Sequence, residues 1–249
     1  MPIASLNNTD IAYFDRGEGP TILLVHGFAS TKEINWVSTG WVKALSEAGY
    51  RIIAHDNRGH GQSEKFYSES DYTIDIMAND AIALLDHLGI EKTHVLGYSM
   101  GARISCTLGM NHGHRFEKII LGGNGYGMVE GNGDWDPVRE ALLAQDESTI
   151  TDARGMAFRK FADRTKGDRK ALAACVGGVR QRISAERIAE ITNPVLVAIG
   201  TKDDIAGSGE ALADLMPNAS YLPIPGRDHM LATGDKAFVA GALEFLNTP

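Results

Sequence analysis

The sequence predicts an α/β fold in which a mostly parallel central sheet is flanked by helices. Short runs of apolar, often β-branched residues alternate with helical stretches in residues 1–124 and again in residues 192–249, a pattern typical of parallel strands joined by helices. The apolar runs are continuous, as expected of strands that are buried on both faces. Residues 125–191 interrupt this alternation with helical segments only, so an all-helical insertion is expected before the penultimate strand.

Eight strands are expected from the apolar runs. The polar tetrapeptide Asn7-Asn8-Thr9-Asp10 separates the first two and predicts a hairpin turn between them. The predicted strands are Ile3–Leu6, Ile11–Phe14, Thr21–Val25, Arg51–Ala54, His94–Leu96, Lys118–Leu121, Val195–Ile199 and Tyr221–Ile224.

Helical segments separate most of these strands. The segment Ile74–Leu88 carries apolar residues at helical spacing and ends at Gly89, a residue suited to closing a helix. The other helices expected in the sheet-forming parts are Val42–Ala48, Ala102–Met110 and Ala237–Leu246.

The insertion at residues 125–191 is interpreted as a cap or lid. The segment Gly122–Gly133 leads into it, and six of these twelve residues are glycine, which suits a hinge. We therefore expect a first core part at 1–124, a helical cap at 125–191 and a second core part at 192–249. The helices predicted in the cap are Pro137–Gln145, Ala153–Asp163, Arg169–Val176 and Ala185–Ile191.

Composition narrows the class of protein. The net charge of −8 argues against a general binder of nucleic acid or other polyanions. No apolar run approaches the roughly 18 residues that a membrane-spanning helix needs, and the amino terminus lacks the pattern of a signal peptide, so a cytoplasmic protein without a membrane partner is expected. Cys106 and Cys175 are expected to be buried free thiols. Nothing in the sequence indicates the oligomeric state.

A candidate nucleophile lies in the pentapeptide Gly97-Tyr98-Ser99-Met100-Gly101. A predicted strand precedes it and a predicted helix follows, so the middle residue lies on an abrupt strand-to-helix turn. Glycines are needed on both sides because side chains there would collide with the neighbouring strand and helix. The Ser99 hydroxyl is then expected at the carboxyl end of the sheet, beside a helix amino terminus that favours negative charge.

A serine hydroxyl needs a base and an orienting carboxylate to act as a nucleophile. Of eight histidines, only His229 follows the last predicted strand, where a loop can bring it over the sheet edge. The loop after the preceding strand offers two carboxylates, Asp203 and Asp204. The sequence order is then serine, aspartate, histidine.

Four motifs resemble the α/β-hydrolase superfamily, and the resemblance covers nearly all of the chain outside the cap. They are His26-Gly27-Phe28, the segment Asp56–Ser63, the pentapeptide around Ser99, and the Asp203/His229 pair. The family's Gly-x-x-Asp pattern matches Gly200–Asp203, which favours Asp203 over Asp204 as the acid. The family usually has glycine before its histidine, whereas this chain has Asp228.

Two backbone amides are expected to form an oxyanion hole. One is the N–H of Met100, which follows the nucleophile, and the resemblance implies that the other is the N–H of Phe28. Large side chains expected to shape the substrate pocket are Trp36, Tyr126, Trp135, Phe158 and Phe161, for each of which packing in the core or between helices is an alternative.

No cofactor and no metal are expected. The sequence lacks a His-Glu-x-x-His motif, and Asp56–Ser63 lacks the Gly-Lys-Ser/Thr ending of a phosphate-binding loop. In the resembled family this segment is a structural turn.

The leading hypothesis is a serine hydrolase that cleaves a small carboxylic ester or lactone through an acyl-enzyme on Ser99, similar to small bacterial carboxylesterases and enol-lactonases. A second hypothesis is hydrolysis of a carbon–carbon bond in a ring-cleavage dienone acid, whose carboxylate Arg103, Arg159 or Arg180 would bind. A third is a ligand-binding receptor or scaffold with a vestigial triad. Dehalogenase and epoxide hydrolase chemistry are disfavoured because such relatives carry aspartate at the position of Ser99.

Overall fold

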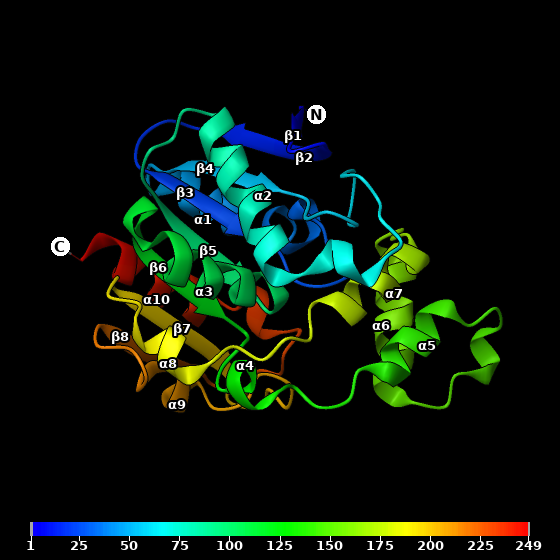
Figure 1. Ribbon diagram of the computed structural model, residues 1–249. Coiled ribbons are helices and arrows are strands. Elements are labelled where there is room, and N and C mark those ends of the chain that lie inside the picture. Colours follow the sequence, from blue (N-terminus) through cyan, green and yellow to red (C-terminus); the bar gives the residue numbers. More distant parts are fainter. Residues whose placement is uncertain (1, 249) are drawn as a thin grey trace.

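Residues 2–248 are described by a computed structural model and are built around one sheet of eight strands (Figure 1). Their order across the sheet is β1-β2-β4-β3-β5-β6-β7-β8. β2 runs antiparallel to β1 and β4, and all other neighbours are parallel. The strands are β1 (Ile3–Leu6), β2 (Thr9–Arg16), β3 (Thr21–Val25), β4 (Arg51–His55), β5 (Thr93–Tyr98), β6 (Phe116–Gly122), β7 (Val195–Gly200) and β8 (Ala219–Ile224). The predicted α/β fold with a mostly parallel sheet is confirmed.

The predicted hairpin joins β1 and β2. Asn7 and Asn8 both have positive φ angles, 50° and 61°, the conformation of a two-residue turn whose twist matches that of the strands. Asparagine tolerates this left-handed region better than most residues. The turn sets the register that pairs Leu6 with Thr9.

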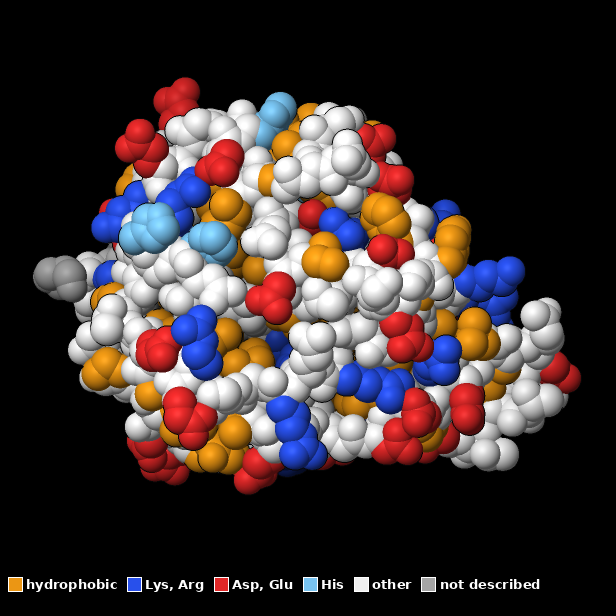
Figure 2. Space-filling model, viewed as in Figure 1, with side chains coloured by type: hydrophobic (Ala, Val, Ile, Leu, Met, Phe, Trp, Pro, Cys, Tyr) orange, Lys and Arg blue, Asp and Glu red, His pale blue; other side chains and the backbone are white. Residues whose placement is uncertain are grey.

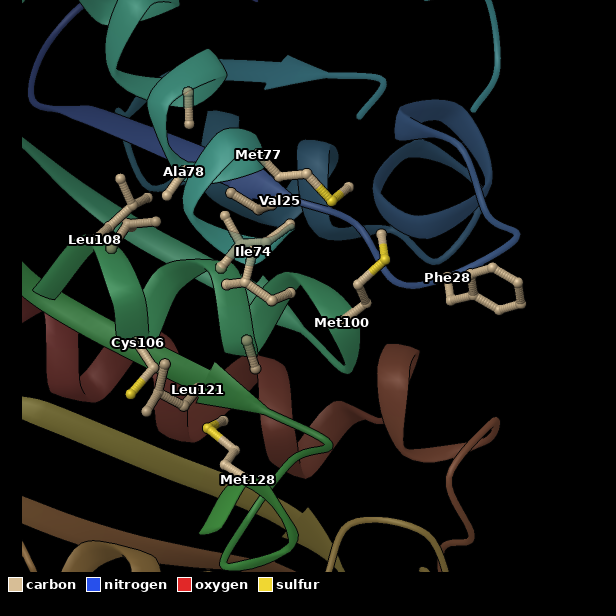
Figure 3. Packing of buried hydrophobic residues seen from close by; sticks show 14 of the residues in the cluster. Val25, Phe28, Ile74, Met77, Ala78, Met100, Cys106, Leu108, Leu121 and Met128 are labelled. Carbon is tan, nitrogen blue, oxygen red and sulfur yellow. The ribbon is translucent and has the colours of Figure 1, made fainter. Parts of the chain in front are cut away.

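Helices cover both faces of the sheet. Along β6, Ile119 and Leu121 face a cluster formed with α2, α3 and α9, whereas Ile120 faces a cluster formed with α1 and α10. This alternation explains why the central strands are apolar throughout. The helices are α1 (Trp41–Glu47), α2 (Ile74–His87), α3 (Met100–His112), α9 (Gly209–Ala213) and α10 (Lys236–Asn247), and part of the first cluster is drawn in Figure 3.

Only helical elements lie between β6 and β7 in the described chain: α4 (Gly127–Glu130), α5 (Asp136–Leu143), a 3-10 turn (Glu147–Thr149), α6 (Ala153–Arg164), α7 (Arg169–Gly178) and α8 (Ala185–Ala189). In Figure 1, α5, α6 and α7 stand together to one side of the sheet, whereas α4 and α8 lie along it. We call α5–α7 the cap. The domain boundaries at 125 and 191 stay a prediction.

Side-chain caps begin the later helices of this insertion. The carboxylate of Asp152 accepts a hydrogen bond from Gly155 N at the start of α6, and Asp168 accepts two at the start of α7. Ser184 does the same for α8. These residues satisfy backbone donors that the first helical turn leaves free, so the insertion is helical by local chemistry as well as by packing.

Trp36 is a correction to the predicted pocket. It lies in a short π-helix (Glu33–Val37) that the sequence analysis missed, and its side chain is fully buried. Its ring packs edge-to-face on Trp41, with centroids 6.1 Å apart, and Trp41 in turn packs on Phe238 of α10. Trp36 therefore belongs to the core on the α1/α10 face of the sheet and not to a pocket wall.

Among residues 2–248, no helix combines the length and the hydrophobicity that crossing a membrane requires. Within the same range, no group of three or more histidine, cysteine, aspartate or glutamate side chains is arranged to hold a metal ion.

Candidate active site

Ser99 stands alone between the end of β5 and the start of α3. Its backbone has φ 56° and ψ −114°, a conformation that L-residues rarely adopt. The turn is possible because its two glycines have no side chain. A Cβ atom on Gly97 would lie 2.1 Å from the carbonyl oxygen of Gly101, and one on Gly101 would lie 1.9 Å from that of Val25 on β3. The strain is thus held in place by the sheet and the helix together.

His229 lies between Ser99 and Asp203. Its Nε2 is 2.9 Å from the Ser99 hydroxyl oxygen, and its Nδ1 is 2.8 Å from Oδ2 of Asp203. An ionised carboxylate only accepts hydrogen bonds, so Nδ1 carries the proton and Nε2 is free to accept the serine proton. The side chains of His229 and Asp203 are 7% and 0% exposed, so little water competes for these bonds.

The loop after β7 separates the two candidate acids. Oδ1 of Asp203 accepts hydrogen bonds from the backbone amides of Ile205 (2.9 Å) and Ala206 (3.0 Å), which leaves Oδ2 facing His229. The next residue, Asp204, is exposed and lines an open groove against α6. The geometry therefore brings Asp203, and not Asp204, to the histidine.

The loop that carries His229 is held from two sides. Oδ1 of Asp228 accepts hydrogen bonds from the amides of Met230 (3.0 Å) and Leu231 (2.8 Å), so the residue that departs from the family's usual glycine closes a local turn. The buried hydroxyl of Tyr98 donates to the carbonyl oxygen of His229 at 2.5 Å. Burial raises the pKa of Tyr98, which keeps this donor protonated.

The backbone at Gly27 and Phe28 lies directly against the serine turn. A Cβ atom on Gly27 would be 3.3 Å from Cβ of Ser99, and the Gly27 amide donates to Oδ1 of Asn35 at 3.0 Å. The amides of Phe28 and Met100 donate to no acceptor among the described residues. In Figure 3 the Met100 side chain points toward Met77, and the Phe28 ring, which belongs to the same buried cluster, lies at its edge. Two free amides beside a serine are the arrangement of an oxyanion hole.

A buried polar network supports this loop. His26 accepts a hydrogen bond from the amide of Asn57 on Nε2 (2.9 Å) and bonds to the Gly27 carbonyl through Nδ1 (2.8 Å), which fixes its neutral tautomer. Lys32, fully buried, lies 2.6 Å from Oδ2 of Asp56. Burial would raise the pKa of Asp56, but the hydrogen bonds from the Gln62 amide and from Lys32 hold it below its usual value.

The structural role predicted for Asp56–Ser63 agrees with these contacts, whereas the contacts of Asn35 and Lys32 were not predicted from the sequence. The π-helix that contains Asn35 and follows Lys32 carries no simple sequence signal, so neither contact was predictable.

Ser99 opens onto two cavities. One, of about 450 Å³, includes Phe28, Ser99, Met100, Arg103 and Trp135 in its lining, and we call it the Arg103 cavity. The other, of about 360 Å³, is lined by Ser99, by His229 and by the cap residues Phe158 and Phe161, and we call it the His229 cavity.

Three of the predicted pocket residues, Trp135, Phe158 and Phe161, line these two cavities. Tyr126, like Trp36, is in neither lining and is a second correction. It begins α4, and its amide bonds to the carbonyl oxygen of Ser208 in the loop before α9.

Fold and site together define the class of protein: a mostly parallel sheet flanked by helices, with a serine, a histidine and an aspartate in contact beyond the carboxyl ends of its strands. The alpha/beta hydrolase fold family model matches residues 20–166. The chain belongs to this family, as the sequence motifs indicated, and the protein is therefore a member of a family of hydrolases.

Named relatives show how varied this family is. A non-heme haloperoxidase of Rhodococcus erythropolis is 29% identical over 263 residues, covering 94% of each chain. Epoxide hydrolase B of Mycobacterium tuberculosis is 34% identical over 106 residues, a match that spans 41% of this chain but only 28% of that enzyme. Among solved structures, the enol-lactonase from Burkholderia xenovorans LB400 has a TM-score of 0.82 at 24% identity and covers 99% of this chain and 100% of its own. These likenesses support the fold and leave the substrate open.

Proposed function

We propose that this protein is a serine hydrolase that cleaves a small carboxylic ester or lactone through an acyl-enzyme on Ser99, acting in the cytoplasm without a cofactor. The observation that carries the proposal is His229, whose two ring nitrogens lie 2.9 Å from Ser99 and 2.8 Å from Asp203. A base in contact with both a nucleophile and an orienting carboxylate is the arrangement that acyl transfer requires.

In the first half-reaction, the Ser99 oxygen attacks the carbonyl carbon while Nε2 of His229 takes the hydroxyl proton. The negative charge that develops on the carbonyl oxygen is stabilised by the amides of Phe28 and Met100, each worth about 10²- to 10³-fold in rate at comparable sites. The C–O bond to the alcohol then breaks, and His229 returns its proton to the leaving oxygen. Asp203 stabilises the imidazolium that exists between these two transfers.

In the second half-reaction, water replaces the alcohol. His229 takes a proton from the water, whose oxygen attacks the acyl carbon, and the Ser99 oxygen leaves with that proton restored by His229. The free acid is released and the three side chains regain their starting protonation.

Hydrolysis of a carbon–carbon bond in a dienone acid is a second candidate function. Arg103 and Arg180 both line the Arg103 cavity, where Arg103 is available to a substrate carboxylate and Arg180 is paired with Asp136 at 2.7 Å. Arg159, the third candidate, lies outside both cavities and is paired with Asp163 at 2.9 Å. Release of a dienoate chromophore, compared with release of an alcohol from an ester, separates the two candidates.

The test of the proposal is turnover of 4-nitrophenyl butyrate by the wild-type protein and by Ser99→Ala. We expect wild-type turnover and a fall in kcat of about 10⁴-fold or more in Ser99→Ala, because the residual rate then comes from binding and the oxyanion hole alone. Ser46→Ala, on the exposed face of α1, is the matched control and should retain the wild-type rate. Near-normal turnover by Ser99→Ala would remove this serine from the mechanism, and saturable binding without any turnover would favour a receptor.

A further inference from the structure

Arg103 differs from the other buried arginines of the described chain. It lies on α3 one turn after Ser99, is 6% exposed and lines the Arg103 cavity. Its guanidinium donates to Oδ1 of Asn132 (3.4 Å) and to the carbonyl oxygen of Gln181, and its Nε has no partner within residues 2–248. This cation therefore has unused hydrogen-bonding capacity next to the nucleophile.

No carboxylate of residues 2–248 lies within ion-pair distance of Arg103. By contrast, buried Arg58 is 2.6 Å from Asp80, and buried Arg159 is 2.9 Å from Asp163. A guanidinium stays charged in proteins, and a buried charge without a counter-ion is destabilising unless a ligand supplies one. The missing counter-ion points to an anionic ligand group.

The charges around the same cavity favour an anion as well. Arg180 and Arg182 are part of its lining, with Glu130 as the one acidic residue. Arg180 is already paired with Asp136 at 2.7 Å, and Glu130 is exposed and forms no ion pair within the described residues. Figure 2 shows Lys and Arg side chains gathered where the cap meets the sheet-bearing part, with acidic side chains beside them.

The two cavities divide the substrate between them. His229 must protonate the leaving oxygen, so the alcohol part lies in the cavity that His229 lines. The acyl part is then left to the second cavity that Ser99 lines, the Arg103 cavity, whose lining also includes Phe28 and Met100. An anionic group that meets Arg103 therefore belongs to the acid half of the ester.

We propose that the substrate is an ester or lactone of a dicarboxylic acid, whose free carboxylate binds Arg103 while its other carbonyl is attacked by Ser99. This inference rests on the proposed function. The free carboxylate takes no part in bond making: one water is consumed and the ester C–O bond breaks. An open-chain ester then gives a dicarboxylic acid and an alcohol, whereas a lactone gives a single hydroxy dicarboxylic acid. Arg103 is thus a specificity-determining residue, and the apolar lining of Phe158 and Phe161 receives the alcohol.

The test compares two esters that differ only in this charge, mono-4-nitrophenyl adipate and its methyl ester, methyl 4-nitrophenyl adipate. We expect the wild-type protein to prefer the anion in kcat/KM. Arg103→Gln should lower this preference by about 10- to 100-fold, the loss typical of one charge-assisted hydrogen-bonded pair, with little change for the neutral ester. Arg103→Lys should retain part of the preference. Arg139→Gln, which removes a cap cation that pairs with Glu69 outside both cavities, is the control and should keep it.

A structural role for Arg103, tying α3 to Asn132 and Gln181, would lower kcat/KM equally for both esters, and that result would overturn the inference. Binding provides a separate measurement, by calorimetry with Ser99→Ala. Adipate should bind at least about tenfold more tightly than dimethyl adipate, and equal affinities would also overturn the inference, even if Arg103→Gln fails to fold. If adipate binds selectively but the wild-type protein hydrolyses no ester, the proposed function fails and the anion site stands.

Discussion

The sheet-borne part of the site and the cap are positioned by different physics. Ser99, Asp203 and His229 follow the ends of β5, β7 and β8, so backbone geometry and parallel pairing bring them together. Trp135 and Phe158 face the cavities only because the cap helices dock against the loops above the sheet. Catalytic groups are thus set by local rules along the chain, whereas pocket walls are set by how two parts of the fold meet. The positions of the catalytic groups are therefore more tightly constrained than those of the pocket residues that would select a substrate.

The largest expected effect tests the sheet-borne part. Asp203→Asn should lower kcat by about 10⁴-fold, since an amide no longer orients the tautomer that leaves Nε2 free. Asp204→Asn, one residue further along the same loop and exposed, should leave kcat within twofold of wild type. Steady-state kinetics with 4-nitrophenyl butyrate checks both variants. A larger loss in Asp204→Asn would show that the acid has been misassigned.

Truncating Trp36 in the core and Trp135 in the cap should change stability by different amounts. Trp36→Ala should lower the free energy of unfolding by about 3–5 kcal/mol, the usual cost of truncating a fully buried aromatic ring. Trp135→Ala should cost less than about 1 kcal/mol, because a half-buried pocket residue leaves no closed void, but should raise KM. Urea unfolding and ester kinetics on both variants measure the two effects. If Trp135→Ala were the less stable of the two, the division between core and cap would be wrong.

The sheet-bearing part should also be the part that is sensitive to acid. Burial, aided by its neighbour His60, lowers the pKa of His26 to about 3, and burial lowers that of His60 to about 4. Both are neutral when folded at pH values at which an unfolded histidine, with a pKa of 6.5, is protonated. The unfolded chain then binds more protons, so this stability is present above about pH 6.5 and is lost as the pH falls toward 4.

Urea unfolding at pH 7 and pH 5 measures how steeply the free energy of unfolding falls with falling pH. His60→Gln should make this fall shallower, because one buried neutral histidine is removed. Residues 125–191 contain no histidine, so hydrogen exchange should show the acid-induced loss of protection in the loops around β3 and β4 before the cap. If His60→Gln left the pH dependence of the free energy of unfolding unchanged, His60 would not be a source of the acid sensitivity.

The smallest expected effect concerns Asp228. Asp228→Gly restores the residue that the family usually has but removes the acceptor for the amides of Met230 and Leu231. We expect a loss of about 1 kcal/mol or less in stability and a severalfold fall in kcat as His229 becomes less ordered. Thermal unfolding and steady-state kinetics check this, and an unchanged kcat would show that the turn is not needed to position the histidine.

The sequence was sufficient to predict what depends on short-range patterns. Each predicted strand is present, with ends that differ by a few residues at most, because apolar runs and turn residues determine them. The contact of His229 with Ser99 followed from strand order. Trp36 and Tyr126 were misjudged because aromatic side chains suit a core, an interhelical contact or a pocket equally well, and only tertiary packing decides. Arg103 was one of three possible anion-binding arginines, and only its missing carboxylate partner sets it apart.

The central claim is that Ser99 is the activated nucleophile, and covalent trapping tests it most directly. After reaction with a fluorophosphonate probe, the mass of the intact protein should rise by that of one attached phosphonyl group. Peptide mapping should place this adduct on Ser99. His229→Gln should abolish labelling while leaving the fold intact, because the serine then has no base. An unlabelled wild-type protein, or an adduct on any other residue, would contradict the account.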